Sequence, residues 1–248
     1  MTTTTTKART QLVEATGRLA VYSLLSAGLA FPDHARLGVL GSRLVPAVAA
    51  LLLPASLEDV FASVSTSVPV DLDVAREHHM ALFPPIASQD APGYETGYRG
   101  DGIFQQAALI ADVSGFYRAH GLRAGGGERE RPDHITVELE FMAVVARKEA
   151  LALRDGADEN VSVCRESAVS FLRDHLGCWA PAFGRRVSAV TRSPWLGALG
   201  EMLALWVEAD MEALDVQPTE VVEGPLPQEP PDDGLCGPCP VSGPEVGR

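Results

Sequence analysis

Apolar residues recur through residues 12–29 at intervals of three and four, the spacing of one face of an α-helix. This face is made of Leu12, Ala15, Leu19, Tyr22, Leu25 and Leu29. Phe31, Pro32 and Asp33 end the pattern, because proline cannot continue a helix. A long helix with one apolar face must have that face covered by other elements of the fold.

Further helical patterns follow, separated by breaks rich in proline and glycine. We expect helical segments at about 34–53 (kinked or broken at Pro46), 57–63, 71–83 and 103–120, then about twenty residues from Pro132, then 161–179 and 194–214. Asp71 is expected to cap its helix, and Gly121 to follow the end of its own. Aromatic residues form only 6% of the chain, and no strand pattern stands out. The prediction is an all-α, single-domain helical bundle.

Three regions are expected along the chain. Residues 1–10 form a flexible N-terminus, 11–215 an all-helical domain, and 216–248 a disordered tail. A chain of 248 residues is long enough for one large core. The tail is acidic and rich in proline and glycine, with too few large apolar residues to bury.

The formal charge of −13 argues against a nucleic-acid partner, which needs a basic surface, and leaves a basic peptide open. Four cysteines show no disulfide framework, so a reducing compartment is expected. No apolar stretch resembles an export signal or a membrane span. We therefore expect a cytoplasmic protein, and the sequence leaves monomer or homodimer undecided.

Residues 84–102 form a long segment without helical periodicity. It contains three prolines, four glycines and the two tyrosines Tyr94 and Tyr98. A loop this long inside a compact domain is usually functional or disordered, and the aromatic residues argue against disorder.

The segment PDHITVELEFM, Pro132 to Met142, carries the clearest candidate site. Asp133 suits a helix N-cap, and His134 and Glu138 share one helix face. If that face opens on a groove, Asp133, His134 and Glu138 form an acidic rim suited to a guanidinium. Simple capping is an equal alternative. A metal site is disfavoured because the HExxH pattern is absent.

Cys236 and Cys239 stand in a Cys-Gly-Pro-Cys sequence that matches the thioredoxin tetrapeptide. A redox pair of this kind needs a preceding strand and a helix N-terminus, whereas this one lies in a proline-rich tail. The pair leaves one alternative, a redox or metal-handling accessory protein. Phosphate-binding glycine loops and nucleophile elbows are missing from the sequence, so we expect neither an enzyme nor a cofactor.

Six segments in order resemble the TorD/DmsD/NarJ family of cytoplasmic chaperones for molybdenum-containing redox enzymes. The likeness covers about residues 15–214 and is greatest to accessory chaperones of the dimethylsulfide, ethylbenzene, selenate and chlorate type. The segments are YSLLSAGLAFPD (22–33), HHMALFPP (78–85), APGYETGY (91–98), GFYRAHGL (115–122), ERPDHITVELEFM (130–142) and FLRDHLGCWAPAF (171–183). His78 and His79 replace the glutamate and tyrosine of the family's Glu-Tyr-x-x-Leu-Phe motif.

The resemblance implies a TorD-like fold and a non-catalytic chaperone. Its partner would be the catalytic subunit of a molybdopterin-dependent oxidoreductase, bound through its twin-arginine signal peptide until the cofactor is inserted. A variant is binding of another client segment, as in the NarJ branch. The client-binding residues implied are Pro132, Asp133, His134, Glu138, Tyr94, Glu95 and Tyr98. Trp179 and Phe183 are expected in the core.

Overall fold

The computed structural model describes residues 2–51, 53–84, 90–100, 102–123 and 130–226. Within these ranges the chain is helical and no strand is formed. The helices are α1 (Thr2–Leu29), α2 (His34–Val39), α3 (Val45–Ala49), α4 (Ala55–Ser67), α5 (Leu72–Leu82), α6 (Ile103–Ala119), α7 (Ile135–Asp155), α8 (Asp158–Phe171), α9 (Gly177–Val190) and α10 (Pro194–Ala213). The all-α prediction is therefore confirmed.

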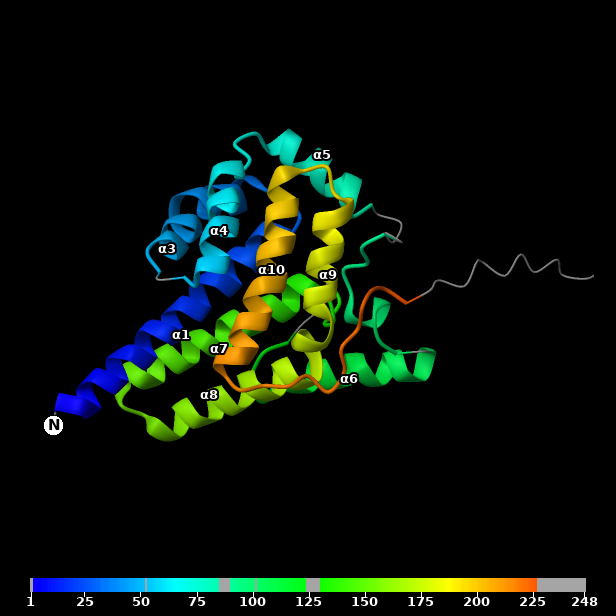
Figure 1. The fold of residues 1–248 in the computed structure, drawn as a ribbon. Coiled ribbons are helices and arrows are strands. Elements are labelled where there is room, and N and C mark those ends of the chain that lie inside the picture. Colours follow the sequence, from blue (N-terminus) through cyan, green and yellow to red (C-terminus); the bar gives the residue numbers. More distant parts are fainter. Residues whose placement is uncertain (1, 52, 85–89, 101, 124–129, 227–248) are drawn as a thin grey trace, which may run out of the picture.

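Two pairs of helices form the frame of the bundle (Figure 1). α1 lies along α7, and α9 lies beside α10, which also packs on α4. α8 packs against α7. The first-helix face predicted from the sequence supplies buried residues of this core, with Tyr22 and Leu25 fully covered. Trp179 and Phe183 are also fully buried, which confirms their predicted place in the core.

A buried polar cluster joins the long helices. Nε of Arg18 on α1 donates to Asp210 on α10 at 2.6 Å, and the hydroxyl of Tyr22 donates to the other oxygen of Asp210 at 2.7 Å. Glu149 on α7 lies 3.5 Å from Arg18 and accepts from Arg165 of α8 at 2.6 Å. Because these charges are paired inside the bundle, they fix the relative positions of four helices.

Several helix ends follow the sequence signals. The side chain of Asp71 accepts hydrogen bonds from the first backbone N–H groups of α5, as predicted. Gly121 has a φ of 72°, the left-handed conformation expected just beyond α6. The expected break at Pro46 is a π-helical turn, η1 (Leu40–Leu44), between α2 and α3. A wider turn accommodates a proline that cannot donate its own backbone hydrogen bond.

The first helix starts before residue 11, the expected start of the helical domain. α1 begins at Thr2, so the helical backbone includes residues expected to form a flexible N-terminus. Once a helix has formed, adding residues at its end needs no new nucleus, and even a threonine run can extend it.

None of the described helices is both long and apolar enough to span a membrane.

Residues 216–226, here called the C-terminal strap, are ordered against the body. Val216 is buried, and the N–H groups of Thr219, Val222 and Leu226 donate to the carbonyls of Arg173, Cys178 and Gly97. The prediction that disorder begins at Val216 is therefore wrong for this strap, because backbone bonds hold it despite its few apolar residues. The rest of the expected tail lies outside the described residues, and Cys236 and Cys239 lie there too.

Candidate binding groove

A groove with a volume of about 930 Å³ opens beside the N-terminal half of α7. Its walls come from the end of α1, from α5, from the loop before η2 (the 3-10 turn Glu95–Gly97), from the chain after α6, and from α7 itself. Its apolar lining includes Leu29, Phe31, Met80, Phe83, Tyr117, Leu122, Ile135, Val137, Phe141 and Val144. Phe31 and Met80 are each 48% exposed, so apolar surface faces solvent here.

Two loops distant in sequence pair to build one wall of the groove. The N–H of Ile135 donates to the carbonyl of Gly93, and the N–H of Glu95 donates to the carbonyl of Asp133, both at 2.9 Å. This antiparallel bridge sets the rings of Tyr94 and His134 edge to face, with 4.9 Å between centroids. The sequence singled out both segments, but it could not show that they pair.

Asp133 is fully buried beneath this wall and does not cap α7. Its carboxylate accepts from the hydroxyl of Thr96 at 2.8 Å and from Arg131 at 2.7 and 3.0 Å. The predicted capping role is therefore wrong. Asp133 instead ties the two loops together, because its oxygens are taken by partners from both.

His134 is the residue that caps α7. Its Nδ1 accepts from the N–H of Thr136 at 3.3 Å and lies 2.7 Å from the hydroxyl of Thr136. Burial lowers the pKa of His134 to about 4, so the ring is neutral at neutral pH. Because Nδ1 accepts, the single hydrogen of the neutral ring is on Nε2. His134 lines the groove.

Glu138 is fully buried one turn further along α7. The indole N–H of Trp179 donates to Oε2 at 3.2 Å, while Oε1 has no hydrogen-bond partner among the described residues. Burial, reinforced by the nearby charge of Glu95, raises the pKa of Glu138 well above its usual range. A fully buried side chain cannot form part of an exposed rim, so the predicted rim of Asp133, His134 and Glu138 is not formed.

The remaining predicted residues divide between wall and interior. Tyr94 lines the groove, and its hydroxyl donates to Glu130 at 3.1 Å. Glu95 is fully buried and pairs with Arg99 at 2.5 Å and with His175 at 3.1 Å.

Two further predicted residues also sit behind the wall. Tyr98 is buried, with its ring centroid 5.3 Å from that of Trp179. The carbonyl of Pro132 accepts from the hydroxyl of Tyr117 at 2.7 Å. Two of the seven predicted residues, Tyr94 and His134, therefore line the groove, and five support it.

The exposed acids of the groove are Glu130 and Glu140, which sequence reasoning missed. Glu140 could have been found from its spacing, because it lies three residues after Val137 and four before Val144, on the same face of α7. Arg36 and Arg123 also line the groove, and Arg36 is paired with Asp33 at 3.1 Å.

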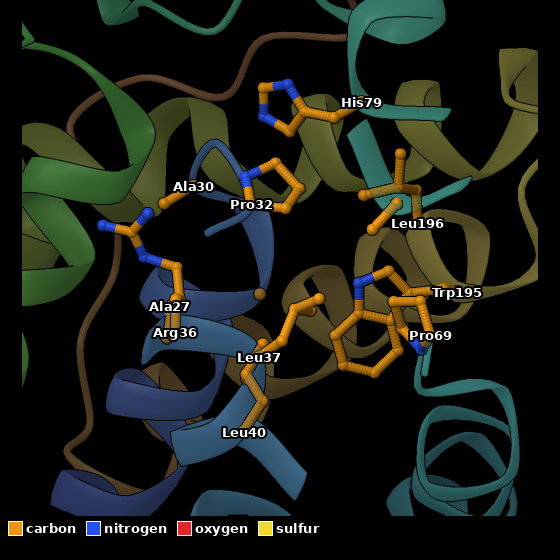
Figure 2. A pocket seen from close by; sticks show the side chains of 12 residues that line it. Ala27, Ala30, Pro32, Arg36, Leu37, Leu40, Pro69, His79, Trp195 and Leu196 are labelled. Carbon is orange, nitrogen blue, oxygen red and sulfur yellow. The ribbon is translucent and has the colours of Figure 1, made fainter. Parts of the chain in front are cut away.

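A second cavity of about 10 Å³ lies between α1, α2, α5 and α10. Figure 2 shows its lining, including Pro32, Leu37, His79 and Trp195. This volume is about that of a single water site, so the cavity cannot hold a client segment. Among the described residues, no group of three or more His, Cys, Asp or Glu is placed to hold a metal ion.

Comparison with known proteins gives the family. Residues 50–185 match the family described as the nitrate reductase delta subunit, which is more than half of the chain. The chain belongs to the nitrate reductase delta subunit family. The match includes both paired loops of the groove, and the resemblance to TorD- and NarJ-type proteins is thereby confirmed.

Three proteins that are similar to this chain in sequence are named as assembly chaperones. The perchlorate reductase assembly chaperone protein of Dechloromonas aromatica is 29% identical over 79% of this chain and 89% of its own length. The selenate reductase assembly chaperone protein of Thauera selenatis is 35% identical over 46% of this chain and 58% of its own. The chlorate reductase assembly chaperone protein of Ideonella dechloratans is 36% identical over 44% of this chain and 55% of its own.

Proposed function

We propose that this protein is a system-specific chaperone for a molybdopterin-containing oxidoreductase. It binds the apo catalytic subunit in the cytoplasm, through the twin-arginine signal peptide of that subunit, and holds it for cofactor insertion, assembly and export. The names of its relatives support a chaperone of reductase assembly. The observation that carries the binding mechanism is the large groove with an apolar lining and two exposed carboxylates.

The chemistry of the groove suits such a peptide. A twin-arginine signal combines two guanidiniums with an apolar run. Phe31, Met80 and Phe83 offer apolar surface to the run, and burying it against the groove drives binding. Glu130 and Glu140 offer carboxylates that can accept paired hydrogen bonds from guanidinium groups.

Polar side chains of the wall complete the contact. His134 and Tyr94 line the groove from the paired loops. Pro132, Asp133, Glu138, Glu95 and Tyr98 act from behind by holding these loops in place. The chaperone itself carries no catalytic step and needs no cofactor in this mechanism.

Co-purification from the native cell tests the function. The full chain with an affinity tag is expected to retain the catalytic subunit of a molybdoenzyme, identified by mass spectrometry. The retained subunit should still carry its signal peptide and lack the pterin cofactor, because the chaperone acts before insertion. Recovery of no such subunit, with the tagged chain folded and expressed, would contradict the proposal.

A further inference from the structure

The groove follows one face of α7 over more than two turns of the helix. The residues of α7 that line it run from Ile135 to Val144. At 1.5 Å per residue this stretch is about 13 Å long. An extended peptide advances about 3.3 Å per residue, so the stretch faces about four residues of a client segment. Different parts of the groove therefore meet different positions of the bound segment.

The end of α1 reaches the groove where α7 begins, because the two helices are antiparallel. The hydroxyl of Ser26 on α1 donates to the carbonyl of Thr136, at the start of α7, at 2.9 Å. Arg18, which is earlier in α1, lies 3.5 Å from Glu149, in the second half of α7. Residues that follow Ser26 in the chain therefore lie at the starting end of α7 or beyond it.

An apolar surface at this end of the groove is built by α1, α5 and the residues after each of them; we call it the α5 end. His79 of α5 holds the two helices together, with Nε2 3.1 Å from the carbonyl oxygen of Leu29. The ring of His79 also contacts the rings of Phe31 and Phe83. The α5 end consists of Leu29, Phe31, Met80 and Phe83.

A second apolar surface, here called the α6 end, lies further along α7. The ring centroid of Phe141 is 5.1 Å from that of Tyr117 on α6. The N–H of Leu122, just after α6, donates to the carbonyl of Tyr117 at 2.8 Å. The α6 end consists of Tyr117, Leu122, Phe141 and Val144. Leu122 and Val144 are partly exposed, so this surface is also open to a bound segment.

The two exposed carboxylates of the groove lie between these apolar ends. Glu130 accepts from the hydroxyl of Tyr94, whose ring packs on His134 at the start of α7. Glu140 lies between Val137 and Val144 on the lining face of the helix. Along α7, the order is therefore the α5 end, Glu130, Glu140 and the α6 end.

A cation, Arg131, lies near Glu130 but does not line the groove. Its guanidinium is over the ring of Tyr94, 4.6 Å from the centroid, and pairs with Asp133 at 2.7 Å. The charges of Arg131 and Asp133 offset each other. The charge of Glu130 therefore remains available to a bound segment.

The cations that do line the groove stand at its two ends. Arg36 donates to the carbonyl of Phe31 at the α5 end, where Arg76 also lies 5.8 Å from the centroid of the Phe31 ring. Arg123 follows Leu122 directly and lines the α6 end. Because like charges repel, arginine side chains of a bound segment avoid both ends and favour the acids between them.

We propose that the bound client segment carries its arginine pair in the middle, opposite Glu130 and Glu140, with apolar side chains on both sides of the pair. One apolar flank lies in the α5 end and the other lies in the α6 end. This inference rests on the proposed function, which supplies the arginine pair and one apolar run, and it adds a second apolar flank. The residues on both sides of the pair then contribute to client selection.

Synthetic peptides with blocked termini test the position of the pair and the need for each flank. The reference peptide is Leu-Ala-Leu-Arg-Arg-Leu-Ala-Leu. Two further peptides carry Ser-Ala-Ser in place of Leu-Ala-Leu, one before the pair and one after it. The last two have the composition of the reference, but the Arg-Arg pair is moved to the first or to the last two positions. Each is titrated calorimetrically into the full chain at low salt.

Three variants probe the two ends of the groove. Met80→Ser removes apolar surface from the α5 end, and Val144→Ser removes it from the α6 end. Val163→Ser is the control, because Val163 is an exposed apolar residue of α8 outside the groove lining. Circular dichroism confirms that each variant is folded.

Both variants of the groove should weaken binding of the reference peptide. The expected loss is roughly fivefold for Met80→Ser and roughly threefold for Val144→Ser, with none for the control. Each loss should disappear in one of the two serine peptides, and the two losses should disappear in different ones, because each end holds a different flank. In the wild type, moving the pair to either end of the peptide should weaken binding about fivefold.

The outcomes distinguish this inference from the function beneath it. The inference is overturned, and the proposed function stands, if Val144→Ser binds the reference peptide as the wild type does or if both losses depend on the same flank. A peptide with the pair at one end that binds the wild type as tightly as the reference overturns it too, and this comparison needs no variant. If none of the peptides binds the folded wild-type chain, twin-arginine recognition and this inference are both contradicted.

Discussion

The indole N–H of Trp179 donates to a carboxyl oxygen of Glu138, 3.2 Å away, and both side chains are fully buried. This contact joins α9 to the start of α7 behind the groove. Because burial raises the pKa of Glu138, the folded protein keeps this carboxyl protonated where the unfolded chain ionises it. Glu138 therefore supports the groove from behind and does not line it.

The first prediction concerns pH and Glu138. As pH rises above the usual value of 4.5 for a glutamate, the unfolded chain loses this proton while the folded chain keeps it. The free energy of unfolding then falls by up to about 1.4 kcal/mol per pH unit. Glu138→Gln cannot titrate and keeps an oxygen for Trp179. Urea unfolding across this range should show the variant gaining stability relative to the wild type as pH rises.

A matched control is Glu166→Gln, which removes the same charge from an exposed site on α8. This control shows what the loss of one surface carboxylate does by itself, so the pH-dependent part of the comparison belongs to Glu138. If Glu138→Gln gains no more stability with rising pH than this control does, Glu138 is ionised in the fold.

The second prediction concerns His134 as a helix cap. Replacing it with alanine removes the acceptor for the N–H of Thr136 and should cost about 1 kcal/mol of stability. His134→Asn supplies an amide oxygen as cap and should retain most of that stability. Chemical unfolding of both variants checks this, and equal losses in the two would argue against capping by Nδ1.

The third prediction follows from the low pKa of His134. Its folded value of about 4 lies below the usual 6.5, so the unfolded chain takes up the proton first as pH falls. The stability from the neutral ring is fully present above about pH 6.5 and is lost as pH falls from there toward 4. His134→Asn should lose less stability over this range than the wild type, as melting temperatures at each pH would show.

The fourth prediction concerns the exposed acids of the groove. The double variant Glu130→Gln/Glu140→Gln should bind a synthetic peptide, with an Arg-Arg pair followed by a run of Leu and Ala, about tenfold more weakly than the wild type does at low salt. The reason is that it loses both exposed carboxylates of the groove. The control Glu166→Gln/Glu201→Gln makes the same charge change on exposed surface of α8 and α10 and should bind nearly as the wild type does. Equal weakening in both double variants would mean that the effect comes from the overall charge of the protein. Isothermal titration calorimetry provides the comparison.

The fifth prediction separates the strap from the residues after it. Truncation after Leu226 removes Cys236 and Cys239, and client maturation should continue. Truncation after Asp215 also removes the strap, with its four backbone hydrogen bonds to Met211, Arg173, Cys178 and Gly97 and the pair of Glu220 with Arg99. That second truncation should cost about 3 kcal/mol. Maturation that stops in the Cys236→Ser/Cys239→Ser double variant would favour a redox or metal-handling role instead.

Local signals in the sequence predicted much of the fold. The spacing of apolar residues located the long helices. The residue types at Asp71 and Gly121 predicted the cap of α5 and the turn after α6, because each of these features depends on neighbouring residues alone. The strap could not be predicted this way. Its order depends on hydrogen bonds to Arg173, Cys178 and Gly97, which lie far away in sequence.

In the candidate site, too, features set by neighbouring residues could be predicted and features set by distant contacts could not. The sequence singled out the two segments that build the groove wall, including Tyr94 and His134. The sequence did not show whether an acid faces inward or outward, so the buried Glu138 and the exposed Glu140, two residues apart, were not told apart. Pairing of the loops at Gly93 and Ile135 moved the start of α7 and gave the cap to His134 in place of Asp133.

The strap also has a consequence for the order of events during synthesis. Its last described residue, Leu226, bonds to Gly97, whose own N–H donates to the carbonyl of Tyr94 in the groove wall. A nascent chain whose strap is still inside the ribosome lacks that support, although α1 and α7 have already emerged. The groove wall is therefore expected to gain this last support only after residue 226 has left the ribosome.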